Sequence, residues 1–269
     1  MAEGRELRVE HATVSFPISR NAGLLALDDV TLRIPPSQIV SLVGPSGCGK
    51  TTVLRLVAGF MRPTHGRVVL GGVDITAPGP DRGVVFQQPT LFPWLNVLDN
   101  VILAPKLRGI PVSTYSAEAA RYLEAVGLAG HERQYPYQLS GGMKQRLQIA
   151  RVLINAPELL LMDEPFGALD YQTRLVMQEL VLKLWGAYQP SVLFITHDVD
   201  EAIFLSDTVY VMASQPGRVL EIIKIPFDRP RSYHELSSSH EFITLRLNIL
   251  ALLGHQRQIQ RATVAQDCP

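Results

Sequence analysis

Residues 39–52 read Ile39-Val-Ser-Leu-Val-Gly-Pro-Ser-Gly-Cys-Gly-Lys-Thr-Thr52, and this stretch decides the fold. Its first five residues are rich in β-branched side chains and predict a buried strand. The turn after them matches the pattern GxxxxGK[ST], and the apolar positions between residues 53 and 58 predict a helix. The alternative is an ordinary glycine-rich turn, but the strand and helix on either side favour a loop whose backbone N–H groups bind phosphate.

The loop predicts a site for ATP and Mg²⁺. The Lys50 ammonium would reach the β- and γ-phosphates, and the Thr51 hydroxyl would hold the metal ion. Cys48 lies among the phosphate-binding amides two residues from Lys50, so we expect the pKa of its thiol to be lowered. The residues predicted to contact the nucleotide here are Gly44, Pro45, Ser46, Gly47, Cys48, Gly49, Lys50, Thr51 and Thr52.

Composition narrows the class of protein. The chain has 269 residues, enough for one elaborated domain with a small appendage, and its 25 basic residues equal its 25 acidic residues in number. A neutral protein has no net field to attract nucleic acid, so we expect no nucleic-acid partner. The N-terminal residues do not resemble a signal peptide, and no apolar run approaches the ~18 residues of a spanning helix. We expect a cytosolic protein that does not itself cross a membrane.

The residues before the phosphate loop predict a β-hairpin. Apolar residues alternate with polar ones through residues 7–34, around a turn at residues 19–23. Phe16 is expected to end the first of these strands. Its ring is either a core side chain or a platform on which the nucleotide base stacks.

Polar side chains follow three further apolar strands, where open parallel sheets place their ligands. Gln87 follows residues 83–86 and could bind Mg²⁺ or its water. Asp163 and Glu164 follow residues 159–162. We predict that Asp163 holds Mg²⁺ and that Glu164 is the general base for the attacking water. His197 follows residues 191–196 and is placed to donate to a γ-phosphate.

A helical insertion is predicted at about residues 90–155. Its first part, 91–101, carries Phe92, Trp94 and a proline, and is either a well-packed helix entry capped by Asn96 or an apolar docking surface for a partner. Near its end, Ser140-Gly141-Gly142 precedes a helix, so Ser140 is a predicted N-cap and the glycines form a second anion-binding nest.

With these motifs in this order, residues 7–225 resemble the ATP-binding subunit of an ABC transporter. The resemblance implies an α/β P-loop NTPase with an antiparallel β subdomain and an inserted helical subdomain. It makes Ser140–Gly142 the signature motif, Asp170 of Ala-Leu-Asp170 a further nucleotide-site residue, and His197 the switch histidine. Phe-Pro-Trp94, Met143 and Pro-Gly-Arg218 resemble the branch of bacterial importers that take up nitrate, sulfonate and taurine.

The resemblance also implies a mechanism and partners. Two copies, or two paired ABC subunits, would bury ATP between the phosphate loop of one chain and the signature nest of the other. Permease subunits would dock near residues 91–101, a periplasmic or extracellular solute-binding protein would act indirectly, and the chain would lie on the cytoplasmic face of the cell membrane. An exporter or lipid-extraction ATPase, or a non-transport ABC ATPase, is the alternative.

The C-terminal part is predicted to be an appendage. Residues 226–239 form a linker rich in proline, arginine and serine, and Phe242, Leu245, Ile249 and Leu252 make one apolar helical face. The catalytic domain is predicted to span residues 1–225. Because every phosphate-contacting motif lies upstream, we expect deletion of residues 240–269 to leave hydrolysis largely intact.

Overall fold

The computed structural model describes the backbone of residues 5–19 and 22–266 and the side chains of residues 5–17 and 23–254. The chain divides into two compact units. One comprises residues 79–190, and the other combines residues 5–78 with residues 191–269. Residues 79–190 are called the insert unit, and the other unit, which contains the phosphate loop, is called the P-loop unit.

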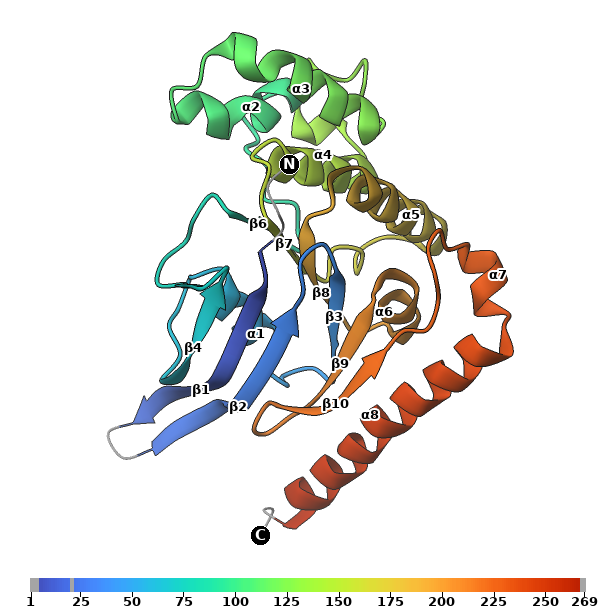
Figure 1. The fold of residues 1–269 in the computed structure, drawn as a ribbon. Coiled ribbons are helices and arrows are strands. Elements are labelled where there is room, and N and C mark those ends of the chain that lie inside the picture. Colours follow the sequence, from blue (N-terminus) through green and yellow to red (C-terminus); the bar gives the residue numbers. More distant parts are fainter. Residues whose placement is uncertain (1–4, 20–21, 267–269) are drawn as a thin grey trace. The chain divides into compact units, whose positions relative to one another are not determined.

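The P-loop unit begins with an antiparallel sheet of order β2-β1-β4-β5 (Figure 1). Its strands are β1 (Leu7–Ser19), β2 (Ala22–Ile34), β4 (His65–Leu70) and β5 (Val73–Asp74). The predicted hairpin is confirmed, but β1 runs past Phe16 to Ser19, so Phe16 does not end the strand. Strand β5 was not predicted, because two exposed residues between turns carry no periodic pattern.

The same unit contains four neighbouring strands in the order β10-β9-β3-β8. Strand β3 pairs in parallel with β8 and β9, whereas β10 pairs antiparallel to β9. These strands are β3 (Ile39–Val43), β8 (Ser191–Thr196), β9 (Thr208–Ala213) and β10 (Arg218–Lys224). Every residue of β3 and β8 is buried, which fits near-continuous apolar runs covered on both faces. The helices are α1 (Lys50–Val57), α6 (Val199–Leu205), α7 (Tyr233–Ser237) and α8 (His240–Gln266).

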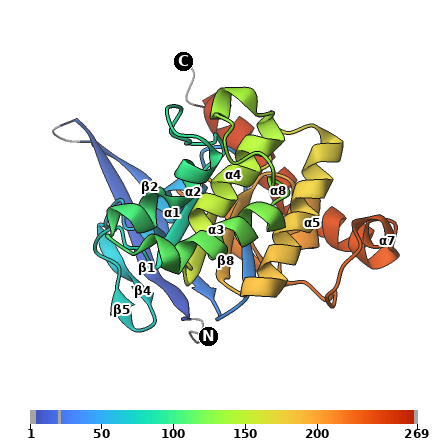
Figure 2. The ribbon, with the colours of Figure 1, turned by 90° about the horizontal axis from the view of Figure 1, so that it is seen from above.

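The insert unit has two parallel strands and four α-helices. They are β6 (Arg82–Val85), α2 (Val97–Leu107), α3 (Val112–Ala125), α4 (Gly141–Leu153), β7 (Leu159–Asp163) and α5 (Tyr171–Tyr188), with a 3-10 turn at Pro136–Gln138. Helices α2, α3 and α4 pack on one another, as the view from above shows (Figure 2). Together they make up the predicted helical subdomain.

Helix α5 buries a different face from the expected one. The spacing of Val176, Leu180 and Leu184 predicts that these residues face the core. Leu184 is buried as expected and Leu180 is half-buried, but Val176 is 49% exposed. Met177 and Val181 are buried beside Leu184. The observed i, i+4, i+7 spacing of positions 177, 181 and 184 is as helical as the expected i, i+4, i+8 spacing, so periodicity alone did not separate two adjacent apolar stripes.

Candidate functional site

The phosphate loop and His197 leave the sheet of the P-loop unit at the same edge. Val43, the last residue of β3, pairs with Thr196, the last residue of β8. Because the strands are parallel, Gly44 and His197 follow at neighbouring carboxyl ends, where open sheets bind ligands. His197 is exposed, as a group that donates to a bound phosphate must be.

Glycines shape the phosphate loop by close packing and by backbone conformation. A Cβ on Gly44 would lie 2.5 Å from Cys48 Sγ and 3.0 Å from the Met212 carbonyl oxygen. Gly49 precedes α1 with φ of 91°, a left-handed conformation that favours glycine. Within the described chain, the first turn of α1 has no side-chain cap. Its N–H groups therefore suit a phosphate oxygen as their acceptor.

Lys50 is folded into the loop. Its side chain is buried, and Nζ donates to the carbonyl oxygens of Gly44 at 2.8 Å and Pro45 at 3.1 Å. These bonds hold the positive charge of Lys50 within the phosphate loop. The ammonium group and the backbone N–H groups of the loop are both suited to anionic phosphate oxygens. The arrangement fits the triphosphate of ATP.

The expectation for Cys48 was wrong. Burial raises the pKa of this thiol, and this outweighs the opposing charge of Lys50. Cys48 is fully buried, with Sγ 3.8 Å from Lys50 Nζ. A nearby cation gives a thiol a lowered pKa only when its attraction for the thiolate exceeds the cost of removing the thiolate from water. The spacing of residues in the sequence did not reveal that the Cys48 thiol is buried.

In the insert unit, Gln87 and Glu164 converge. Val85 pairs with Met162 in the parallel ladder, so both side chains follow neighbouring strand ends. A Cβ on Gly167 would lie 3.2 Å from Gln87 Nε2 and 3.8 Å from Glu164 Oε2. Glu164 itself has φ of 44°. Such a conformation costs a non-glycine residue on the order of 1 kcal/mol and is concentrated at functional sites.

The predicted metal ligands are divided between the units. Asp163 ends β7 and is half-buried, and Gln87 lies in the same unit, whereas Thr51 belongs to the P-loop unit. Within residues 5–19 and 22–266, no three His, Cys, Asp or Glu side chains are placed to hold a metal ion together. The predicted set of one hydroxyl, one amide and one carboxylate leaves room for phosphate oxygens, which is how Mg²⁺ usually binds.

Two predicted nucleotide-site residues of the insert unit are helix caps. Ser140 Oγ accepts from the Met143 N–H at 3.3 Å, so the predicted N-cap of α4 is confirmed. Asp170 caps α5 by accepting from the Thr173 N–H at 3.0 Å, and this bond lowers the pKa of the carboxyl. The sequence had marked Asp170 only by resemblance.

The two signature glycines differ in their surroundings. A Cβ on Gly141 would meet no described heavy atom within 4 Å, whereas one on Gly142 would lie 2.9 Å from the Thr173 methyl group. Gly142 is thus needed for packing within this chain. Gly141 faces open space, which leaves the backbone at the start of α4 accessible to a ligand.

Three side chains that the sequence did not single out hold residues 86–92, the segment around Gln87. Gln145 of α4 donates to the Phe86 carbonyl oxygen at 3.3 Å. Arg151 of α4 donates to the Thr90 carbonyl oxygen at 2.7 Å. Asn100 of α2 is fully buried and bonds the Phe92 backbone N–H and carbonyl. A signal existed for Gln145, because it shares an i, i+4, i+7 stripe with Ile149 and Val152 and is therefore a polar residue at a buried position.

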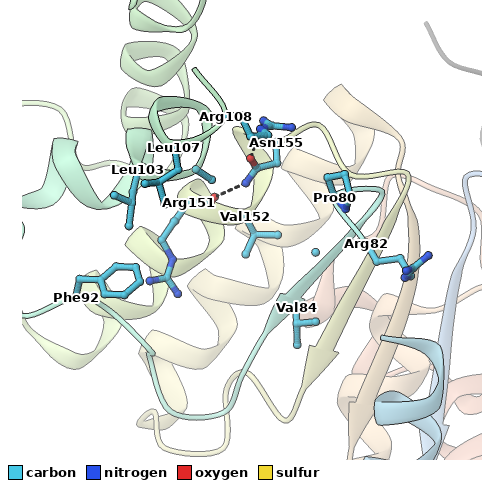
Figure 3. Close-up of a pocket in the computed structure, with 12 residues that line it drawn as sticks. Pro80, Arg82, Val84, Phe92, Leu103, Leu107, Arg108, Arg151, Val152 and Asn155 are labelled. Atoms are coloured by element: carbon cyan, nitrogen blue, oxygen red, sulfur yellow. Dashed lines mark hydrogen bonds between the residues drawn. The ribbon is translucent and has the colours of Figure 1, made fainter. Parts of the chain in front are cut away.

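A groove of about 470 Å³ lies beside this segment (Figure 3). Its apolar lining comes from β6, α2 and α4, and Figure 3 shows the Arg151 guanidinium next to the Phe92 ring. The guanidinium carbon is 5.4 Å from the ring centroid, a cation–π distance. The lining residues are Pro80, Arg82, Gly83, Val84, Phe92, Leu103, Ala104, Leu107, Arg108, Arg151, Val152 and Asn155.

Residues 91–101 satisfy both interpretations of their sequence. Asn96 caps α2 by accepting from the Asp99 N–H, as the helix-entry interpretation predicted. Trp94 is nevertheless 70% exposed and packs its ring 5.6 Å from that of Phe92. Phe16 is 37% exposed, so the core interpretation of its ring is wrong and base stacking stays a prediction.

None of the helices over the described ranges is both long and apolar enough to span a membrane.

Comparison with known proteins places this geometry among relatives. Residues 27–167 match the family described as ABC transporter. A taurine import ATP-binding protein, TauB, from Chromobacterium violaceum is 48% identical over 237 residues, which cover 87% of this chain and 91% of the relative. TauB from Shigella boydii is 45% identical over 94% of this chain and 98% of its own. An uncharacterized ABC transporter ATP-binding protein, MJ0412, from Methanocaldococcus jannaschii is 49% identical over 92% and 91%.

Solved structures agree in fold. A dimeric, post-hydrolysis structure of the ATP-binding cassette MJ0796 bound to ADP and Pi has a TM-score of 0.71 and 29% identity. It covers 82% of this chain and the whole of the other. The cassette cbiO1 from Clostridium perfringens, at 23% identity, has a TM-score of 0.75 and supports the fold alone.

Proposed function

The chain belongs to the ABC transporter family and is an ATP-binding cassette that hydrolyses ATP, and from this premise we propose that it powers an importer. The proposed solute is taurine, a related sulfonate or nitrate. The observation that carries the proposal is the similarity to TauB from two organisms along nearly the whole chain. The proposed location is the cytoplasmic face of the cell membrane, where a cassette would meet its permease. We propose residues 1–225 as the catalytic domain and 226–269 as its appendage.

The proposed active site is built from the residues that the sequence predicts for it. The phosphate loop and Lys50 would bind the triphosphate, and Thr51, Gln87 and Asp163 are the residues that would hold Mg²⁺. Glu164 takes a proton from the attacking water, and His197 donates to the γ-phosphate as charge develops on it. When bound, Mg²⁺ would supply charge stabilisation for phosphoryl transfer.

A second copy is proposed to complete each site. The Ser140–Gly142 nest would close over the γ-phosphate bound by the partner's phosphate loop, so that two ATP molecules are buried across a two-fold axis. The open space at Gly141 supports this arrangement, since the helix start can approach a ligand without a clash. Asp170, three residues before Thr173, would lie at the same interface.

The groove lined by Phe92 and Arg151 is proposed as the docking site of a permease helix. It is apolar along α2 and bounded by Arg82, Arg108 and Arg151, which suits an amphipathic helix that ends in acidic or carbonyl groups. Arg151 joins the groove to the backbone of Thr90, three residues after Gln87. Movement at Gln87 would therefore reach the docked helix through one short segment.

The groove supplies a test of the importer. Leu107 lines it and is 77% exposed, whereas Val112 is a similarly exposed apolar residue outside it. Leu107→Glu should abolish copurification with a coexpressed taurine permease and ATP-dependent taurine uptake into proteoliposomes that contain the complex. The ATPase activity of the isolated chain should persist. Val112→Glu is the matched control.

Equal loss of uptake in both variants would remove the groove as the docking site. ATP-dependent release of taurine from the binding protein's side, rather than uptake, would overturn the importer itself.

A further inference from the structure

His197 has its backbone fixed by helix α6. Thr196 Oγ1, just before His197, donates to the Glu201 carboxylate at 2.6 Å. Just after it, Asp198 Oδ1 accepts from the N–H groups of Asp200 at 2.9 Å and Glu201 at 3.2 Å. The position of His197 therefore follows the position of the first turn of α6.

The far end of α6 is held by a buried arginine of the C-terminal segment, by which we mean residues 226–254. Arg231 Nη1 donates to the carbonyl oxygens of Ile203 at 3.2 Å, Phe204 at 2.8 Å and Ser206 at 2.8 Å. These carbonyls have no partner within the helix, so the guanidinium satisfies groups that helix ends leave open. Burial lowers the pKa of Arg231 to about 10, which still leaves it charged at neutral pH.

The near end of α6 is held by the two helices of the same segment. The carboxylate of Asp200, in the first turn, forms an ion pair with Arg246 Nε of α8 at 3.1 Å and accepts a hydrogen bond from the Tyr233 hydroxyl of α7 at 3.5 Å. The Tyr233 ring also stands edge-on to the rings of Phe204, 5.3 Å away, and Phe242, 6.4 Å away. Polar contacts from residues distant in the sequence therefore hold both ends of helix α6.

Apolar packing joins the same elements. Phe242 and Ile249 of α8 are buried in one cluster with Ile203 of α6 and Val43, the residue before the phosphate loop. The apolar face predicted for residues 242–252 is confirmed, with Leu245 and Leu252 packed against this cluster. The C-terminal segment shares an apolar core with β3, the strand that leads into the phosphate loop. This shared core argues against the expectation that deletion of residues 240–269 leaves hydrolysis largely intact.

We propose that the C-terminal segment is a positioning element for His197, which it orients by fixing both ends of α6. Arg231, Tyr233 and Arg246 are positioning residues, because the contacts that carry the argument are made to α6 and to the residue at its end. The proposal rests on the proposed function, in which His197 contacts the γ-phosphate. Loosening α6 would then slow hydrolysis and leave nucleotide binding to the phosphate loop.

Two variants of the full chain test this, with one control. The double variant Tyr233→Phe/Arg246→Ala removes both contacts to Asp200, and Arg231→Lys keeps the charge but loses the fork of donors. Asn248→Ala is the control, because Asn248 is an exposed residue of α8. We expect kcat to fall about fivefold in the double variant and more in Arg231→Lys, with KM for MgATP within about twofold. Asn248→Ala should match the parent.

Two readouts separate positioning from general destabilisation. Amide hydrogen exchange measured by mass spectrometry should become faster in residues 197–206 of the variants and stay unchanged in the β1–β2 hairpin. In a His197→Ala background, measured by single-turnover hydrolysis, the double variant should cause no further loss, because both changes remove one function.

The outcomes distinguish the two proposals. A fivefold loss that persists in the His197→Ala background would overturn the positioning role, since the segment would then act elsewhere. So would unchanged kcat in both variants while His197→Ala is strongly impaired. Near-normal hydrolysis by His197→Ala alone would instead overturn the proposed role of His197 in catalysis.

Discussion

The phosphate loop and the signature motif both present glycines at the start of a helix, yet the two regions are built differently. In the P-loop unit, Gly44 is packed against Cys48 and Met212, and Lys50 is buried in bonds to its own loop. In the insert unit, Ser140 and Gly141 are exposed at the start of α4. One region is closely packed within its own unit, and the other leaves the backbone at a helix start exposed on the surface of its unit.

The two regions should therefore respond differently to substitution. A region that works through close backbone packing should tolerate no added atoms. A region that works through an open backbone surface should tolerate a small added group but not a bulky one that covers the surface. The following predictions test this contrast, beginning with the largest effect.

Glu164→Gln should retain ATP binding and lower kcat by roughly 10²–10⁴-fold, because the amide keeps the shape of the side chain and loses its basicity. Nucleotide affinity by equilibrium dialysis and phosphate release in steady state are the measurements. Turnover within tenfold of the parent would show that another group accepts the proton.

Gly44→Ala should weaken ATP binding by about 1–3 kcal/mol, because the new methyl group overlaps Cys48 Sγ and the Met212 carbonyl. Gly186→Ala in α5 is the control, since its Cβ would meet no described atom within 4 Å. Binding of a fluorescent ATP analogue reports the effect. Unchanged affinity in Gly44→Ala would mean that the loop relaxes freely and that close packing around Gly44 does not shape the site.

Cys48 should react slowly with thiol reagents, because burial both shields Sγ and raises the pKa of the thiol. Only the thiolate reacts. A raised pKa means less thiolate at neutral pH, and the labelling rate should still be rising with pH above 9.0, the ordinary value. A Cys268→Ser background isolates the signal, and MgATP should slow it further. Labelling as fast as that of a peptide thiol at pH 7 would contradict this burial.

Gln145→Leu should lower kcat a few-fold and stability by about 1 kcal/mol, because the Phe86 carbonyl loses its donor. Gln148→Leu, one turn further along α4, is the matched control. Among the described residues neither amide atom of the fully buried Gln148 has a hydrogen-bond partner, so leucine there should be neutral or stabilising. Thermal unfolding and steady-state hydrolysis distinguish the two, and equal behaviour would show that Gln145 does not anchor the segment around Gln87.

Much of this contrast could be read from the sequence. Motifs that join a strand to a helix, such as residues 39–52, indicate both elements through local sequence patterns. The predicted elements that are confirmed are β3, α1, β7, β8 and the helix caps Ser140 and Asn96. Local patterns of this kind depend on neighbours in the chain.

What the sequence did not reveal depends on distant neighbours. The pKa of Cys48 is set by burial, and the face of α5 is set by its packing partners. Arg231 donates to carbonyl oxygens at the end of α6, 25 to 28 residues away in the sequence. An arginine in a proline-rich stretch suggests a solvated linker, and only the fold shows that its side chain is 1% exposed.

The central claim is that each ATP site takes Lys50 from one chain and Ser140 from another, and tagged heterodimers test it most directly. Lys50→Ala removes the phosphate-binding charge, and Ser140→Arg blocks the nest. Vanadate trapping of MgADP counts intact sites without requiring both to turn over. If sites are shared, a dimer with the two changes on opposite chains keeps one intact site and traps nucleotide, whereas a dimer of a doubly changed chain with a parent chain traps none. Trapping by the second dimer and none by the first would contradict the account.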